Sequence, residues 1–499
     1  MKWILIISLI LVPFTGFSQK DNGEVHYINF DPFLDADSLF SNPVLPIKSQ
    51  TQEVGFRLIN KENKWISGNY ITIFPVVDIA SSYRSGSLTT SSFYGGAGIG
   101  MTAHFFQQLY GRFTLTSNYH YYDGIPDPFS SLFKTDFQSW QQNKFSSIGL
   151  QPQGRLSYSP YDFLNLQVGI DQSFIGQGNR SMLLSDYGAP YPFVQLQTKI
   201  WKIEVTNLYQ FFKENKGIET IPKYASTHFF NFNILDGFQF GIFESVVFSP
   251  KDTLTHRGYE VAYLNPFLFY RPTEYGLGSQ DRLLIGLNLS YEFNNVMLYG
   301  QFVLDEFVLK EMLNRTRWWA NKYAGQFGIK GKNTFINGNR ITWLGELNFA
   351  RPFTYSHLNK STSYSNQGRP LAHPMGANFA EVFIETTLQV HSKWKLGTQF
   401  FFVQQGGYDG TAQISFGKDV NQSYVYRPYE YGYHIGGNGK VNRFHFSVNG
   451  NYIISKKLAL EVFVRPGIEL NNFTGKYQGH FMVLGGIRTN LWNDRSFSF

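Results

Sequence analysis

Charged residues that alternate with apolar ones are the side chains best placed to do chemistry in this sequence. Between Leu458 and Leu470 every even position is apolar or proline, whereas the odd positions include two glutamates and an arginine. Segments 379–390 and 443–452 alternate in the same way. Successive side chains of a strand point to opposite faces, so each segment predicts one charged and one apolar face. Six residues are candidates for an inward-facing charged surface: Glu381, Glu385, Arg443, Glu461, Arg465 and Glu469.

Two roles fit these charges, and the sequence leaves both open. A network of ion pairs would keep the interior of a barrel solvated or plugged, whereas a polar channel or a glycan contact surface would use the same side chains for function. The loop aromatics pose a similar choice, since tyrosine suits both sugar-ring stacking and a membrane-interface girdle. The residues concerned are Tyr408, Tyr424, Tyr426, Arg427, Tyr429, Tyr431 and Tyr433.

Motifs for catalysis or cofactor binding are absent from the sequence. It has no phosphate-binding glycine loop, no Gly-x-Ser-x-Gly elbow and no His-Glu-x-x-His helix. The chain has 0 Cys, which excludes disulfides, Cys-ligated zinc, iron–sulfur clusters and a cysteine nucleophile. His373 has only a distant carboxylate, Glu381, and a single histidine of this kind is more often a loop hydrogen-bonding residue than a metal ligand. We expect no catalytic residue, metal or cofactor; an enzyme site assembled from several loops is the alternative.

The composition of the chain excludes further classes of protein. The 43 basic and 36 acidic residues are scattered without a Lys/Arg run, so we expect no nucleic-acid partner. Aromatic residues make up 18% of the chain and charged residues 16%, which argues against disorder and against a coiled coil. This balance indicates a chain that buries aromatic surface.

The elements that must position these residues are strands. Residues 283–293 alternate strictly between apolar and polar or small side chains over a length that crosses a membrane when tilted. Similar alternation predicts strands over Leu164–Ile170, Phe193–Ile200, Trp201–Tyr209, Val296–Leu304, Tyr323–Lys330, Ile341–Phe349, Phe379–Val390, Lys395–Val403, Arg443–Tyr452 and Leu458–Leu470.

A closed transmembrane antiparallel β-barrel explains this pattern better than a β-sandwich or a propeller. The predicted strands have about ten residues, longer than the usual five or six of soluble sheets. Aromatic groups such as Phe211–Phe212, Phe229–Phe230, Phe267–Tyr270 and Phe400–Phe402 are expected at interfacial girdles. Short connectors such as 293–295 contrast with long polar ones such as 358–378 and 404–424. We therefore predict an all-β barrel of roughly 14 to 20 strands, an estimate from about ten residues per strand.

The chain divides into three expected parts. Residues 1–18 have the charged start, apolar stretch and small residues of a signal peptide, which predicts export. Residues 19–68 are expected to form a periplasmic segment or plug, and residues 69–499 the barrel. Within the barrel, 305–321 is spaced like a short helix in a loop, and the C-terminal Phe499 is typical of a closing barrel strand.

Several segments resemble a known family. They are Phe174–Asp186, Pro190–Phe193, Lys199–Ile203, Tyr263–Arg271, Leu298–Phe307, Arg351–His357 and Leu371–Phe379. Over roughly residues 160 to 390 they resemble the Wzi-like capsule-assembly outer-membrane proteins, and within these the Bacteroidetes branch known as gliding motility protein RemB. The chain departs from the capsule protein in lacking an obvious amphipathic three-helix bundle before the barrel.

The resemblance implies an eighteen-stranded, non-enzymatic barrel in the outer membrane of a Gram-negative bacterium. Its implied role is attachment or organisation of surface polysaccharide, or gliding motility, with membrane lipid, polysaccharide and other outer-membrane or motility components as partners. A porin-like diffusion channel for a small solute remains the alternative. The polar positions of this chain that match the resembled family, and that we carry over as candidate site residues, are Gly178, Asn179, Arg180, Ser185, Asp186, Asp305, Glu306, Arg351, Tyr355 and His373.

Overall fold

The computed structural model describes residues 56–57, 70–85, 90–106, 108–123, 138–142, 146–216, 219–250, 258–266, 270, 281–334, 339–390, 393–407, 414–456, 458–473 and 476–489. The expected signal peptide, nearly all of the segment 19–68, Tyr408 and the terminal Phe499 lie outside these residues.

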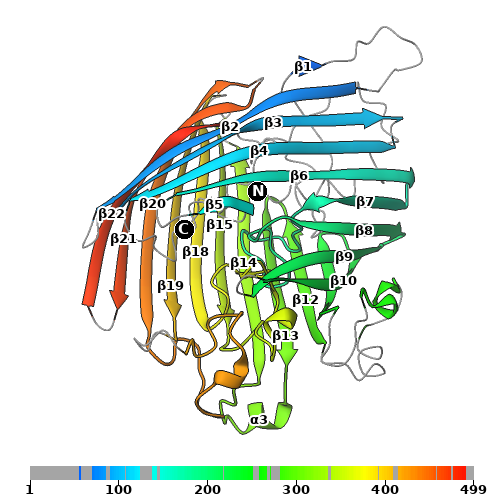
Figure 1. Ribbon diagram of the computed structural model, residues 1–499, viewed down its shortest axis with the longest axis vertical. Coiled ribbons are helices and arrows are strands. Elements are labelled where there is room, and N and C mark those ends of the chain that lie inside the picture. The colour runs from blue at the N-terminus through cyan, green and yellow to red at the C-terminus, as the bar shows by residue number, and fades with distance from the viewer. Residues whose placement is uncertain are drawn as a thin grey trace.

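Eighteen long antiparallel strands form one closed barrel (Figure 1). The closing pair is β2 with β22, in register from Asp78 opposite Arg488 to Ser85 opposite Phe481. Two short strands, β1 (Phe56–Arg57) and β5 (Gln138–Gln142), pair with β2 and β6 outside this count. The barrel strands are β2 (Tyr70–Ser85), β3 (Thr90–Phe105), β4 (Leu109–Asp123), β6 (Ser146–Tyr161), β7 (Leu164–Asp171), β8 (Tyr191–Ile200), β9 (Ile203–Lys216), β10 (Glu219–Leu235), β11 (Phe238–Phe248), β12 (Arg282–Phe293), β13 (Val296–Glu306), β14 (Lys322–Thr334), β15 (Arg340–Ala350), β18 (Phe379–Val390), β19 (Trp394–Gln405), β20 (Val441–Ser455), β21 (Leu460–Phe473) and β22 (Lys476–Thr489).

The alternating pattern of each strand separates a lipid-facing wall from an interior wall. In β12, Leu287 and Leu289 are 38% and 41% exposed, whereas Asn288 between them is 0% exposed. In β21, Val462 and Val464 are exposed and Glu461 is buried. Apolar side chains outside and polar side chains inside are the arrangement that a membrane barrel requires. The predicted barrel is therefore confirmed, and eighteen strands fall within the predicted range.

Connections between strands differ sharply at the two ends of the barrel. At one end, which we call the short-turn end, no connection exceeds five residues; they are 106–108, 162–163, 201–202, 236–237, 294–295, 335–339, 391–393 and 456–459. The other end carries all the long connections, and we call it the long-loop end. Its connections are 86–89, 124–145, 172–190, 217–218, 249–281, 307–321, 351–378, 406–440 and 474–475. The long connectors expected from the sequence thus all lie at one end, together with three short ones.

In the described ranges, helix is confined to short pieces in the loops. The predicted helical insertion is α3 (Leu309–Leu313), whereas Asp305 and Glu306, expected to begin it, are the last residues of β13. Three 3-10 turns occupy other loops: η1 (Val261–Leu264), η2 (Lys360–Thr362) and η3 (Tyr424–Tyr426). Among the described residues, no helix has the length and apolar character needed to span a membrane.

Two details of the prediction are wrong. The barrel strands are 8 to 17 residues long rather than about ten. An aromatic pair supplies at most one of its two rings to an interfacial girdle, since neighbouring residues of a strand face opposite ways. Phe229 and Phe401 lie inside the barrel, 0% and 1% exposed, while Phe402 faces outward.

Candidate functional site

The connection between β7 and β8, residues 172–190, folds into the barrel; we call it the inner loop. Residues 173–186 are all buried, which is unusual for a loop, because every buried backbone N–H and C=O needs a partner. The loop pairs with itself through an isolated bridge between Ile175 and Leu184. Gln172 and Ser173 bond to Arg155 of β6 and Tyr191 of β8. Many other partners come from the opposite wall, strands β12 to β18, and from the loop 351–378. The inner loop therefore spans the interior.

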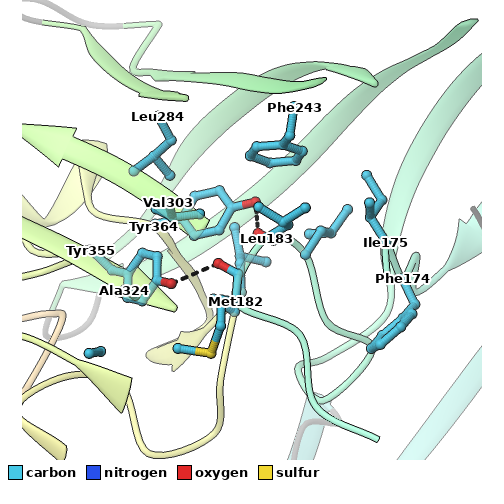
Figure 2. Packing of buried hydrophobic residues seen from close by; sticks show 14 of the residues in the cluster. Phe174, Ile175, Met182, Leu183, Phe243, Leu284, Val303, Ala324, Tyr355 and Tyr364 are labelled. Carbon is cyan, nitrogen blue, oxygen red and sulfur yellow. Dashed lines mark hydrogen bonds between the residues drawn. The ribbon is translucent and has the colours of Figure 1, made fainter. Parts of the chain in front are cut away.

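An apolar contact holds one side of the inner loop (Figure 2). Phe174, Ile175, Met182 and Leu183 are 0–2% exposed and belong to one cluster with Phe243, Leu284 and Val303 of the barrel wall. Two tyrosines of the loop 351–378 complete the contact: the Tyr355 hydroxyl donates to the Met182 carbonyl over 2.7 Å, and the Tyr364 hydroxyl to the Leu183 carbonyl over 2.8 Å. Burial raises the pKa of Tyr355, so its hydroxyl stays a donor.

Long polar side chains of the wall satisfy the inner-loop backbone. Gln301 of β13 accepts from the Met182 N–H over 2.7 Å and donates to the Ile175 carbonyl over 3.0 Å. Gln326 of β14 donates to the Arg180 carbonyl over 2.9 Å, and Lys330 to the Gln177 carbonyl over 2.7 Å. These bonds replace the water that a surface loop would have used. They fix the loop to one place on the wall.

Glu346 of β15 is the main anionic contact of the inner loop. Its carboxylate accepts from the Asn179 N–H over 2.5 Å, from the Arg180 N–H over 3.3 Å and from the Tyr299 hydroxyl over 2.7 Å. The approach is close enough that a Cβ added at Gly178 would lie 2.2 Å from Glu346 Oε1. The same Cβ would lie 2.9 Å from the Arg180 carbonyl oxygen, so any larger residue would force this part of the loop to shift.

A second buried charge group joins the inner loop, β18 and the loop 351–378. Glu381 lies 3.8 Å from the Arg180 Nε and 2.8 Å from the His373 Nε2, and it accepts from Asn348 over 2.9 Å. His373 Nδ1 accepts from the Met375 N–H over 3.2 Å, so the proton of the neutral ring sits on Nε2 and points at Glu381. Burial lowers the pKa of His373, although Glu381 opposes this shift. His373 is therefore a neutral hydrogen-bond donor that links Glu381 to the loop 351–378.

The ion pair at the end of β13 anchors the loop 351–378. Asp305 pairs with the Arg282 guanidinium and accepts from the Tyr355 N–H over 2.9 Å, while Arg282 also donates to the Tyr355 carbonyl. Glu306, next in the chain, is 3.0 Å from the Lys322 Nζ. Buried charges of this kind cost desolvation unless paired, so the contacts specify position more than they add stability. Tyr355 is thus held at both its backbone and its hydroxyl.

Further contacts attach the loop 351–378 to the far wall. The buried Lys223 of β10 donates to the Lys360 carbonyl over 3.2 Å and to the Ser363 and Ser365 hydroxyls over 3.3 and 3.1 Å. Glu214 of β9 lies 3.0 Å from the Lys360 Nζ. The loop 351–378 therefore reaches across the interior as the inner loop does, from the opposite side.

The remaining carried-over positions take structural roles beside these. The Ser185 N–H donates to the Leu371 carbonyl over 2.7 Å, which joins the two inward loops, and Asp186 is buried next to it. Arg351 donates to the carbonyls of Trp318 and Tyr433 over 3.3 and 3.2 Å, at the long-loop end. The structure brings all ten positions to the inward loops and their anchors.

The six charges predicted to face inward divide into two groups. Glu381 and Glu385 touch the inner loop, the latter through the Asn179 side chain over 3.1 Å. The other four form a wall network on β20 and β21, away from the inner loop. Glu461 accepts from Arg488 over 2.8 Å, Glu469 lies 3.5 Å from Arg443, and Arg465 donates to Asn449 over 3.0 Å. These four serve as ion pairs and hydrogen bonds of the wall.

At the long-loop end, three neighbouring loops (307–321, 351–378 and 406–440) join into one unit, which we call the outer loop cluster. The Trp319 indole N–H donates to Glu430 over 2.7 Å. The guanidinium carbon of Arg427 lies 4.1 Å from the centre of the Trp319 ring. The Phe353 N–H donates to the Gly417 carbonyl over 2.8 Å. Arg427 also lowers the pKa of Glu430 by hydrogen bonding. The tyrosines predicted from the loop 406–440 differ in exposure. Tyr433 is buried, while Tyr426, Tyr429 and Tyr431 are 66%, 39% and 53% exposed.

Sequence reasoning missed the residues that hold the inner loop, namely Glu346, Gln301, Gln326 and Lys330. Each is a polar residue at the interior position of its strand, so the alternation signalled which way it faces. Nothing in the sequence signalled the partner. In the described ranges, no three His, Cys, Asp or Glu side chains are grouped as a metal ion would require.

No family model and no curated protein matches the sequence. Among solved structures, the chain is similar to Wzi of Escherichia coli, which is described as an outer membrane protein involved in group 1 capsule assembly and as a carbohydrate-binding β-barrel. The TM-score is 0.51 and the sequence identity 12%, and the match covers 82% of this chain and 84% of that one. It is less similar to OprD of Pseudomonas aeruginosa (TM-score 0.41, 11% identity, 83% and 94% covered) and to OccAB1 of Acinetobacter baumannii (TM-score 0.43, 8% identity, 84% and 96% covered). The chain therefore has the fold of a Gram-negative outer-membrane β-barrel, similar to that of Wzi.

Proposed function

We propose that this protein is a non-enzymatic outer-membrane barrel that binds surface polysaccharide with its long-loop end and does not conduct solutes. The observation that carries the proposal is the inner loop, buried along its length and bonded to Gln301, Lys330 and Glu346 across the interior. A crossing bonded at both walls supports an obstructed interior rather than an open bore. A surface-binding protein can use the barrel as a sealed support for its loops.

The topology supports an outward-facing position for the long-loop end. Bacterial outer-membrane barrels have short periplasmic turns and longer extracellular loops. Here all the connections longer than five residues lie at one end, including the outer loop cluster. The exposed Tyr426 and Tyr431 are then available for stacking against sugar rings outside the cell. The fold likeness to Wzi, itself described as carbohydrate-binding, agrees with this use.

Two measurements on the purified full-length protein test the proposal. In planar bilayers we expect no steady single-channel conductance, and by affinity electrophoresis we expect retardation by surface polysaccharide extracted from the source cells. Steady conductance would favour the porin alternative. Failure to bind the extract would reject polysaccharide binding.

Gene deletion separates the finer roles implied by the sequence resemblance. Loss of polysaccharide retention by the deletion strain would support surface organisation. Normal retention with impaired colony spreading would instead support the motility role.

A further inference from the structure

The outer loop cluster contains more basic than acidic residues. Its three loops, 307–321, 351–378 and 406–440, contain nine Lys or Arg and four Asp or Glu, a net charge of +5 where the whole chain has +7. The long loop beside them, 249–281, contains three basic and four acidic residues. The positive charge is therefore a property of one sector of the long-loop end. Figure 1 shows this sector at the bottom of the view, around α3.

The acidic side chains around α3 already have partners. Glu311 accepts from the Thr316 hydroxyl over 2.8 Å. Glu430 is bound by Arg427, with 2.5 Å between the closer nitrogen and oxygen, and by the Trp319 indole. Glu430 thus neutralises Arg427, and Glu311 is bonded to a hydroxyl, so neither carboxylate is paired with Arg315 or Arg317.

Arg315 and Arg317 are two of the basic side chains of the cluster that these carboxylates leave unpaired. Both are exposed, and within the part of the chain that the structure describes neither side chain has an ion-pair or hydrogen-bond partner. Their backbone is fixed, with φ of 52° and 57° in the left-handed region that non-glycine residues rarely adopt. The Gly432 N–H donates to the Thr316 carbonyl over 3.3 Å, and the Tyr433 N–H to the Arg317 carbonyl over 3.0 Å. The two arginines are thus held beside the segment that presents Tyr431.

We propose that Arg315 and Arg317, with the exposed Tyr431, form a binding surface for an acidic polysaccharide. Arginine binds carboxylate through two parallel hydrogen bonds, and tyrosine stacks against sugar rings. Charge complementarity selects a polymer that carries uronate or other acidic groups over a neutral one. This inference rests on the proposed function and adds the chemical class of its ligand.

The test compares salt dependence and variants by affinity electrophoresis of the full-length protein. The probes are polysaccharide extracted from the source cells, alginate as a polyuronate, and dextran as a neutral polymer. We expect binding to the extract and to alginate but not to dextran. Binding is expected to weaken between about 0.1 M and about 1 M NaCl, where the Debye length falls from about 10 Å to about 3 Å.

The double variant R315Q/R317Q is expected to bind about tenfold more weakly, the effect of losing two partly exposed charged contacts. R315K/R317K, which keeps both charges, should recover most of the loss. The matched control is K393Q/K456Q, which removes two exposed charges from the short-turn end and should bind as the native protein does. All variants are first shown to be folded by heat-modifiable migration.

The inference is overturned if the extract binds equally at both salt concentrations and equally to R315Q/R317Q, or if dextran competes as well as alginate. In either case polysaccharide binding itself stands. Absence of any binding to the extract rejects the proposed function instead.

Discussion

Truncating Glu346 should release the inner loop from the barrel wall. Glu346 receives hydrogen bonds from two backbone N–H groups of that loop, those of Asn179 and Arg180, over 2.5 and 3.3 Å. The substitution E346A removes both bonds and leaves the N–H groups buried without their acceptor. The barrel itself is expected to persist, because Glu346 contributes its backbone, not its side chain, to the pairing of β15 with β14 and β18.

The size of the effect follows from these two bonds. A hydrogen bond to a charged group contributes about 1.5–3 kcal/mol, so losing two at the lower value costs about 3 kcal/mol of docking free energy. Since each 1.4 kcal/mol is a factor of ten, the ratio of undocked to docked inner loop should rise roughly a hundredfold. Water that enters the site can bond to the released N–H groups and will make the increase in this ratio smaller.

The assay is single-channel recording combined with hydrogen exchange of residues 174–184. We expect E346A to show conductance bursts that the native protein lacks, and faster exchange confined to this segment. The control is E461A, which removes a carboxylate that is equally buried but bonded only to Asn451 and Arg488 of the wall. If E346A leaves both readouts unchanged, or if E461A changes them equally, Glu346 does not hold the loop and the reasoning fails.

Three further outcomes follow from the same contacts. The substitution G178A should displace the inner loop, since its Cβ would lie 2.2 Å from a Glu346 oxygen and 2.9 Å from the Arg180 carbonyl oxygen. G188A should be tolerated, because its Cβ would lie 3.8 Å from the nearest atom, the Pro370 carbonyl oxygen. Hydrogen exchange distinguishes the two variants, and equal protection would contradict the packing. Burial lowers the pKa of His357 to about 3, below the unfolded value near 6.5, so its neutral form stabilises the fold above pH 6.5. As the pH falls below that value the loop 351–378 should lose about 1.4 kcal/mol per pH unit, seen as protease sensitivity that H357Q does not share. Finally, D305A should lower barrel stability by about 3–5 kcal/mol because it leaves a buried arginine unpaired, and a urea midpoint close to that of the native protein would refute this.

The sequence predicted the barrel because the responsible signal is local. A strand in a membrane must alternate between lipid and interior, so side chains such as Leu287 and Asn288 report their own environment. The predicted strands Phe379–Val390 and Val296–Leu304 accordingly agree with β18 and β13 to within two residues. The same logic was misapplied to adjacent phenylalanines, since Phe401 and Phe402 cannot both face the membrane interface.

What occupies the interior was decided only by the tertiary structure. The partners of the inner loop lie far away in the chain: Gln301 is 119 residues from Met182, and Glu385 is 206 residues from Asn179. No periodicity links such positions, because a loop has no fixed direction until the closed barrel supplies a wall to receive it. The sequence by itself determined which face of each strand is polar. Closing eighteen strands into a cylinder determined which of those polar residues meet, since closure places β7 and β15 on facing walls.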